Sequence, residues 1–199
     1  MEEVAQTESW KELNKLPPEE LAKIPYNDPR LDAFAATVEQ RYSLPPGLIE
    51  AVKNAGERSN TTQVSSAGAK GVMQFIASTL KLYPHDYKNP LASIDASGQY
   101  FRDLMKQYKG NVKAMVAHYN GGTVAGKAIL AGAEAPKEET RNYWKRLQGY
   151  MEKKQKVTEA PANAAVPPVA PQDTFLDKVK RAAPPFLGGE GELVSKVFK

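Results

Sequence analysis

A glutamic acid, Glu57, ends an apolar helical pattern and stands before a long polar stretch. A carboxyl group at such a place can act as a general acid if neighbouring apolar groups raise its pKa towards neutrality. The spacing also fits a simpler interpretation, because Glu50, Asn54 and Glu57 recur at the interval of a solvent-exposed helix face. The pattern makes Glu57 a candidate catalytic acid and leaves both interpretations open.

Small residues and two glycines fill the segment 65–75, which reads Ser-Ser-Ala-Gly-Ala-Lys-Gly-Val-Met-Gln-Phe. Such a segment lets the backbone approach a ligand closely. It is not a phosphate-binding loop, because no Gly-Lys-Ser/Thr follows at the required spacing. The alternative is an ordinary mobile loop.

A second polar group, Tyr119-Asn120-Gly121-Gly122, ends another helical pattern. Its tyrosine and asparagine could form hydrogen bonds with a sugar, although a glycine pair is also a common helix C-terminus. His118 precedes this group. No serine nucleophile motif accompanies it, so a Ser-His-Asp site is disfavoured and we expect a structural histidine.

These candidates lie between segments whose apolar residues recur at helical spacing. No alternating strand of convincing length occurs, so the sequence predicts an all-α domain. The expected helices cover about residues 31–38, 45–56, 75–82, 94–108, 112–119, 123–130 and 136–154.

Composition narrows the chemistry further. The 199 residues contain no cysteine, which excludes disulfides, zinc–thiolate sites and thiol nucleophiles. With only two histidines the sequence argues against a histidine-rich metal site, and we expect neither a metal nor a cofactor. The net charge of +4 is too small to argue for nucleic acid. No apolar run reaches the roughly 18 residues of a membrane-spanning helix.

Taken in order, four stretches resemble a known family. They are Glu57, the run Ser-Ala-Gly-Ala-Lys-Gly-Val-Met-Gln, the run Ala117–Gly122, and Glu139-Thr140-Arg141-Asn142-Tyr143. Their order and spacing resemble the lytic transglycosylase domain of the soluble-transglycosylase type, which is related to goose-type lysozyme. That family has a glutamate ending a helix, followed by Gly-Leu-Met-Gln, Tyr-Asn-Ala-Gly and Glu-Thr-x-x-Tyr motifs. The resemblance covers about residues 31–151.

The resemblance implies a lysozyme-like helical fold with a cleft for polysaccharide. It implies cleavage of the MurNAc–GlcNAc β-1,4 bond of peptidoglycan with formation of 1,6-anhydromuramic ends, and Glu57 as acid and base. The matching substrate-binding positions are Ser59, Met73, Gln74, Tyr119, Asn120 and Tyr143. The interval 74 − 57 = 17 is one residue shorter than is usual in the family, so an ungapped match aligns Gly56 with the catalytic position.

We expect three parts in the chain: an N-terminal arm (1–30), a catalytic domain (31–156), and an Ala/Pro linker with a C-terminal docking tail (157–199). The tail holds two small apolar clusters, around Phe175 and Val197, that cannot fold alone. We expect the arms to bind other virion proteins or a second copy of the chain.

The first residues are acidic and lack the apolar core of a signal peptide. We therefore expect synthesis in a host cytoplasm and transport to the periplasmic peptidoglycan inside a bacteriophage virion, during DNA ejection. The alternatives are an inactive virion structural or ejection protein with this fold, a hydrolytic goose-type lysozyme, and a secretion-system accessory enzyme.

Overall fold

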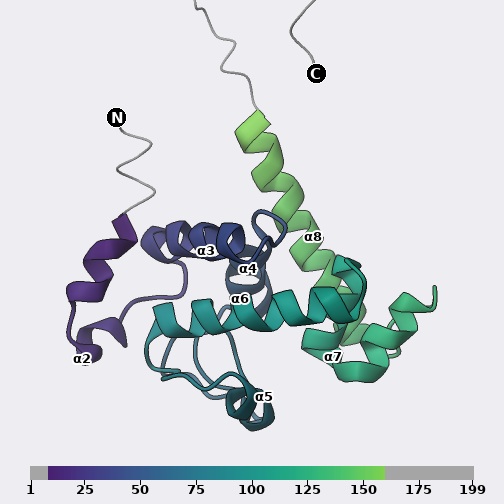
Figure 1. Ribbon diagram of the computed structural model, residues 1–199, viewed down its shortest axis with the longest axis horizontal. Coiled ribbons are helices and arrows are strands. Elements are labelled where there is room, and N and C mark those ends of the chain that lie inside the picture. Colours follow the sequence, from purple (N-terminus) through teal and green to yellow (C-terminus); the bar gives the residue numbers. More distant parts are fainter. Residues whose placement is uncertain (1–8, 160–199) are drawn as a thin grey trace, which may run out of the picture. The chain divides into compact units, whose positions relative to one another are not determined.

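The regular elements of the computed structural model, which describes residues 9–159, are all helices (Figure 1). Across these residues the extended backbone is limited to two isolated β-bridges, which confirms the predicted all-α class. None of the helices in this range has the length and apolar character needed to cross a membrane. The helices are η1 (Ser9–Lys15), α2 (Pro18–Leu21), α3 (Pro29–Arg41), α4 (Leu48–Ala51), η2 (Val52–Glu57), α5 (Ala77–Leu82), α6 (Pro90–Gln107), α7 (Val112–Leu130) and α8 (Glu138–Glu159).

Helix α4 and helix η2 form one continuous segment that contacts α3 and α8 (Figure 1). Helix α4 also contacts α6. The side chains of Leu48, Ile49 and Val52 are fully buried in the core. Burial on several sides stabilises this short segment, because four α-helical residues cannot form a stable helix alone. The segment ends at Glu57, so the packing of its neighbours determines where that carboxyl lies.

A buried carboxylate of α3 caps the N-terminal end of the α4–η2 segment. Glu39 of α3 accepts hydrogen bonds from the backbone amides of Gly47 and Ile49, both at 2.6 Å. These amides have no partner within the helix, and a carboxylate oxygen satisfies them. Burial raises the pKa of Glu39 to about 7, although the same backbone hydrogen bonds oppose that rise.

The N-terminal residues that the structure describes pack on the helical domain itself. Leu13 is fully buried, and the Trp10 ring lies 4.7 Å from the ring of Phe34 on α3. Leu21 and Ile24 are also buried in the same core. Residues 9–28 therefore pack on the domain that follows them: η1 contacts α3, and the backbone of Tyr26 contacts the side chains of Lys53 and Asn60. The expected linker and docking tail lie outside the described residues from position 160 onward.

Several helix boundaries differ from the sequence prediction; α3 and α6, for example, begin at Pro29 and Pro90, before the expected positions 31 and 94. The helix expected over 45–56 is α-helical only over Leu48–Ala51 and continues as the π-helix η2, while the last helix runs on to Glu159. The break at the glycine pair is confirmed: Gly122 has φ 79° and ψ −177°, a conformation that only glycine adopts readily. It separates α7 into two helical pieces.

Candidate active site

A π-turn positions Glu57. The amide of Arg58 donates to the carbonyl oxygen of Lys53 at 3.0 Å, which is the i→i−5 bond of a π-helix. Arg58 then adopts a left-handed conformation (φ 50°) and ends the helix. A π-turn corresponds to one residue inserted into an α-helix. The turn lies on the N-terminal side of Glu57, so the 17-residue interval from Glu57 to Gln74 belongs to the segment that follows it.

Tyr143 of α8 lies against this turn. Its hydroxyl donates to Oε1 of Glu57 at 2.6 Å, and the tyrosine itself is only 2% exposed. The ring also covers Gly56, where an added Cβ atom would lie 2.4 Å from the Tyr143 hydroxyl oxygen. Position 56 therefore has no room for a side chain. The carboxyl of the next residue, Glu57, accepts the hydrogen bond from the Tyr143 hydroxyl.

The surroundings of Glu57 favour its protonated form. Burial raises the pKa of Glu57 to about 7; the Tyr143 hydrogen bond lowers it, the charge of Glu139 raises it, and Arg146 lowers it. A carboxyl with this pKa is about half protonated at neutral pH, so it can both donate and accept a proton in one reaction cycle.

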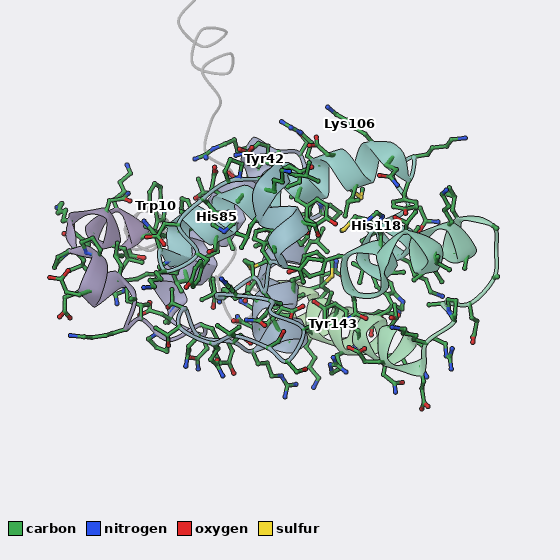
Figure 2. The ribbon with its side chains drawn as sticks, turned by 90° about the horizontal axis from the view of Figure 1, so that it is seen from below. Trp10, Tyr42, His85, Lys106, His118 and Tyr143 are labelled. Carbon is green, nitrogen blue, oxygen red and sulfur yellow. The ribbon has the colours of Figure 1, made fainter. Side chains whose placement is uncertain are left out.

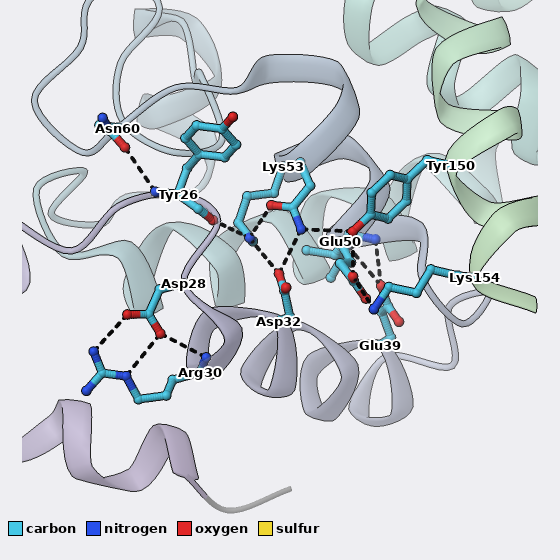
Figure 3. Close-up of polar contacts among 12 residues, drawn as sticks. Tyr26, Asp28, Arg30, Asp32, Glu39, Glu50, Lys53, Asn60, Tyr150 and Lys154 are labelled. Atoms are coloured by element: carbon cyan, nitrogen blue, oxygen red, sulfur yellow. Dashed lines mark hydrogen bonds and ion pairs between the residues drawn. The ribbon is translucent and has the colours of Figure 1, made fainter. Parts of the chain in front are cut away.

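A buried polar network supports the other side of η2 (Figure 3). Lys53 is fully buried, and its Nζ donates to Oδ1 of Asp32 at 2.7 Å, to Oδ1 of Asn54 at 2.6 Å and to the carbonyl oxygen of Tyr26. Asn54 donates in turn to Asp32 at 2.9 Å and to the hydroxyl of Tyr150 at 3.0 Å. The network connects η2 to α3 and α8.

Glu50 belongs to the same network. Tyr150 donates to Oε1 of Glu50 at 2.6 Å, and Nζ of Lys154 lies 2.6 Å from the same oxygen. The interpretation of Glu50, Asn54 and Glu57 as a solvent-exposed polar face is therefore wrong. Helix α8 covers that face, and its tyrosines provide the partners.

A pocket of about 330 Å³ is lined by residues of α5, α6 and α7 and of the segment before α5; Glu57 is not one of its lining residues. Three of the sequence-predicted positions, Gln74, Tyr119 and Asn120, line it. Tyr119 lines the pocket and also feels the charge of the acid: burial and then the charge of Glu57 raise the pKa of Tyr119 well above its usual range. The remaining walls are Phe75, Ile76, Ser78, Thr79, Leu82, Tyr100, His118, Gly122 and Thr123.

Backbone contacts hold these residues in place. The Tyr119 hydroxyl donates to the carbonyl oxygen of Met73, and Nε2 of Gln74 donates to the carbonyl oxygen of Gly71 at 2.8 Å. Gln74 itself has a left-handed backbone (φ 45°). Met73 is fully buried, and the Ser59 hydroxyl donates to the carbonyl oxygen of Glu57 at 3.0 Å. These two candidates therefore contact other parts of the protein and do not line the pocket.

Three further residues of this region, His118, Tyr100 and Glu139, were not predicted as site residues. His118 and Tyr100 line the pocket, and no spacing signal separates them from core residues. The carboxylate of Glu139 accepts a hydrogen bond from Nδ2 of Asn120 at 3.2 Å. Glu139 opens the Glu-Thr-x-x-Tyr motif, so its place in that motif was the available signal.

A helical domain in which Glu57, a carboxyl of raised pKa, ends a helix, and which also has a pocket walled by aromatic, hydroxyl and amide groups, is an arrangement suited to cleaving polysaccharide. Residues 34–142 match the family model of the transglycosylase SLT domain. The match extends over more than half of the chain, so the chain belongs to this family. Membership confirms the lysozyme-like fold and implies an enzyme of the lytic transglycosylase type that acts on peptidoglycan.

Proposed function

We propose that this chain cleaves the MurNAc–GlcNAc β-1,4 bond of peptidoglycan by intramolecular transglycosylation, with Glu57 as both acid and base. The observation that carries the proposal is the Glu57 carboxyl, buried beside Tyr143 with a pKa raised by burial to about 7. A carboxyl of this pKa is about half protonated at neutral pH, so both the acid form and the base form are available.

In the first step protonated Glu57 gives its proton to the glycosidic oxygen, and the bond from that oxygen to C1 of the muramic residue breaks. In the second step the Glu57 carboxylate takes the proton of the muramic C6 hydroxyl while O6 bonds to C1. The product carries a 1,6-anhydro ring, no water is consumed, and Glu57 ends protonated.

Tyr143 assists the second step. Burial, followed by the charge of Glu57, raises the pKa of Tyr143 well above its usual range, so its hydroxyl stays a donor throughout. Its hydrogen bond stabilises the carboxylate that forms after the first proton transfer. We assign sugar binding to Gln74, Tyr119 and Asn120 because they line the pocket. Ser59 and Met73 then act by supporting the backbone around the acid.

Glu139 favours a second candidate, hydrolysis of the same bond as in a goose-type lysozyme. It is a carboxylate whose charge acts on Glu57, and glycosidases that use water commonly employ two carboxyl groups. In that reaction Glu139 would activate the water that attacks C1.

Digestion of purified peptidoglycan in ¹⁸O-labelled water, followed by mass analysis, distinguishes the two. Transglycosylation predicts muramic ends lighter by one water and free of ¹⁸O. Hydrolysis predicts reducing muramic ends that carry ¹⁸O. The variant Glu139→Gln is the matched test: it retains turnover in the first reaction and loses it in the second. Absence of both products with the wild-type chain would support an inactive protein with this fold.

We further propose that the enzyme is carried in a bacteriophage virion and opens the wall during DNA ejection. The Ala/Pro-rich segment with two apolar clusters in residues 157–199 supports this, since such a tail suits attachment to a larger assembly. Density-purified particles should contain the chain in constant proportion to the capsid protein. Its presence only in the lysate supernatant would refute virion carriage without affecting the proposed chemistry.

A further inference from the structure

His118 is held in one orientation at the wall of the pocket. Its Nδ1 lies 2.7 Å from the hydroxyl oxygen of Tyr108, and the ring of Tyr100 meets the imidazole edge-on at 6.4 Å. His118 lies on α7, opposite the end of α6, in the region of Figure 2 between these helices. Within residues 9–159 no hydrogen bond reaches its second nitrogen, Nε2; this atom is not among the buried polar atoms without a partner, and His118 lines the pocket.

The Tyr108 contact pairs Nδ1 of His118 and leaves Nε2 as the unpaired ring nitrogen. Burial raises the pKa of Tyr108, and a hydrogen bond from the Gln107 side chain opposes that rise. The phenol hydroxyl is within donating distance of Nδ1 of His118, and we take it as the donor of this hydrogen bond. Burial also lowers the pKa of His118, which keeps the imidazole neutral. A neutral imidazole that accepts at Nδ1 carries its hydrogen on Nε2, which becomes a donor towards the pocket.

We infer that His118 is a specificity residue of the pocket, whose Nε2–H donates to the acetamido carbonyl oxygen of a bound N-acetylhexosamine. The inference rests on the proposed function, because it takes the pocket to be the glycan-binding cleft. Among the oxygens of a neutral amino sugar, the amide carbonyl is the strongest acceptor.

The apolar wall of the same pocket fits the rest of the acetamido group. Ile76 and Leu82 line it and remain 44% and 74% exposed. The acetamido group has a methyl group, which these apolar side chains can contact, and a carbonyl oxygen, which can accept from the N–H of His118 in the same pocket. A sugar with a hydroxyl at C2 would leave this apolar surface in water and offer a weaker acceptor.

Imidazole ¹⁵N NMR of the full-length chain tests the inference without turnover. The chain has two histidines, and the variant His85→Gln assigns their signals. We expect His118 in the Nε2–H form, and a shift of its Nε2 signal on adding tri-N-acetylchitotriose. Cellotriose, which has hydroxyls in place of the acetamido groups, should leave the signal unchanged. The variant His118→Phe keeps the ring without the donor and should weaken chitotriose binding about five- to tenfold.

Three results would overturn the inference: His118 in the Nδ1–H form, equal shifts with both sugars, or unchanged chitotriose affinity in His118→Phe. If that variant does not fold, the wild-type comparison of the two sugars still decides. Because chitotriose contains no muramic acid, its binding is independent of bond cleavage. An inactive chain that binds it through His118 would refute the proposed reaction alone, and an active chain with an unaffected His118 would refute this inference alone.

Discussion

Replacing Asp32 with asparagine should destabilise this domain far more than replacing Asp95 with asparagine, although each change breaks one ion pair. Lys53 Nζ lies 2.7 Å from Asp32, and the lysine side chain is 0% exposed. Arg41 lies 2.5 Å from Asp95, with side chains 48% and 30% exposed. Asp32→Asn leaves an ammonium group buried, whereas Asp95→Asn leaves a guanidinium group in water.

The expected magnitudes follow from that difference in burial. Removing one partner of a buried pair costs about 3–5 kcal/mol, and an exposed pair contributes about 0–1 kcal/mol. For a domain of this size, Asp32→Asn should lower Tm by about 6–20 °C, because each kcal/mol corresponds to roughly 2–4 °C. Asp95→Asn should lower it by no more than about 4 °C.

The deficit of Asp32→Asn should also depend on pH. Burial lowers the pKa of Lys53 from 10.5, and Asp32 opposes this, so the variant lowers that pKa further. Between the folded and unfolded pKa values the unfolded chain binds more protons, and stability therefore rises with pH. The variant enters this window at a lower pH than the wild type, so its deficit should shrink as the pH rises towards 10.5.

Urea unfolding followed by circular dichroism, at neutral and at alkaline pH, measures both effects. Equal free energies of unfolding for the two variants, or a deficit of Asp32→Asn that does not change with pH, would refute the account of Lys53 as a buried ammonium supported by Asp32.

Other predictions concern the site and the tail. Glu57→Gln should reduce wall cleavage at least about 10²-fold while leaving Tm unchanged or slightly higher above pH 7, because it removes a carboxylate that burial disfavours; a turbidity assay with a thermal melt checks both. Glu139→Gln should move the alkaline limb of the pH–rate profile to lower pH, since the charge of Glu139 raises the pKa of Glu57; a shift to higher pH would contradict this. Gly56→Ala should reduce the rate of wall cleavage, because its Cβ displaces the Tyr143 hydroxyl from Glu57. A wild-type rate in that variant would show that the contact between Tyr143 and Glu57 is dispensable. Removing residues 160–199 should leave both Tm and cleavage of isolated wall unchanged, and a fall of several degrees in Tm would mean that the tail packs on the domain.

Local signals were sufficient for most of the helical architecture. Asp28 and Asn89 each precede a proline, and each side chain accepts backbone hydrogen bonds at the start of a long helix. Gly122 breaks α7 where its sequence neighbours predict a break. Such features depend on a few adjacent residues, so the sequence by itself determines them. The order of the motifs likewise led to the family before any contact was known.

The tertiary structure alone decided what surrounds the polar residues. Helical spacing placed Glu50, Asn54 and Glu57 together on one face but could not tell that α8 covers it. Tyr143 reaches Glu57 from 86 positions along the chain, and Tyr150 reaches Glu50 from 100. The π-turn also escaped prediction, since it depends on packing and on a buried lysine held by α3. A pKa raised by burial is a property of the assembled core, because only folding removes the water that would otherwise solvate the carboxylate.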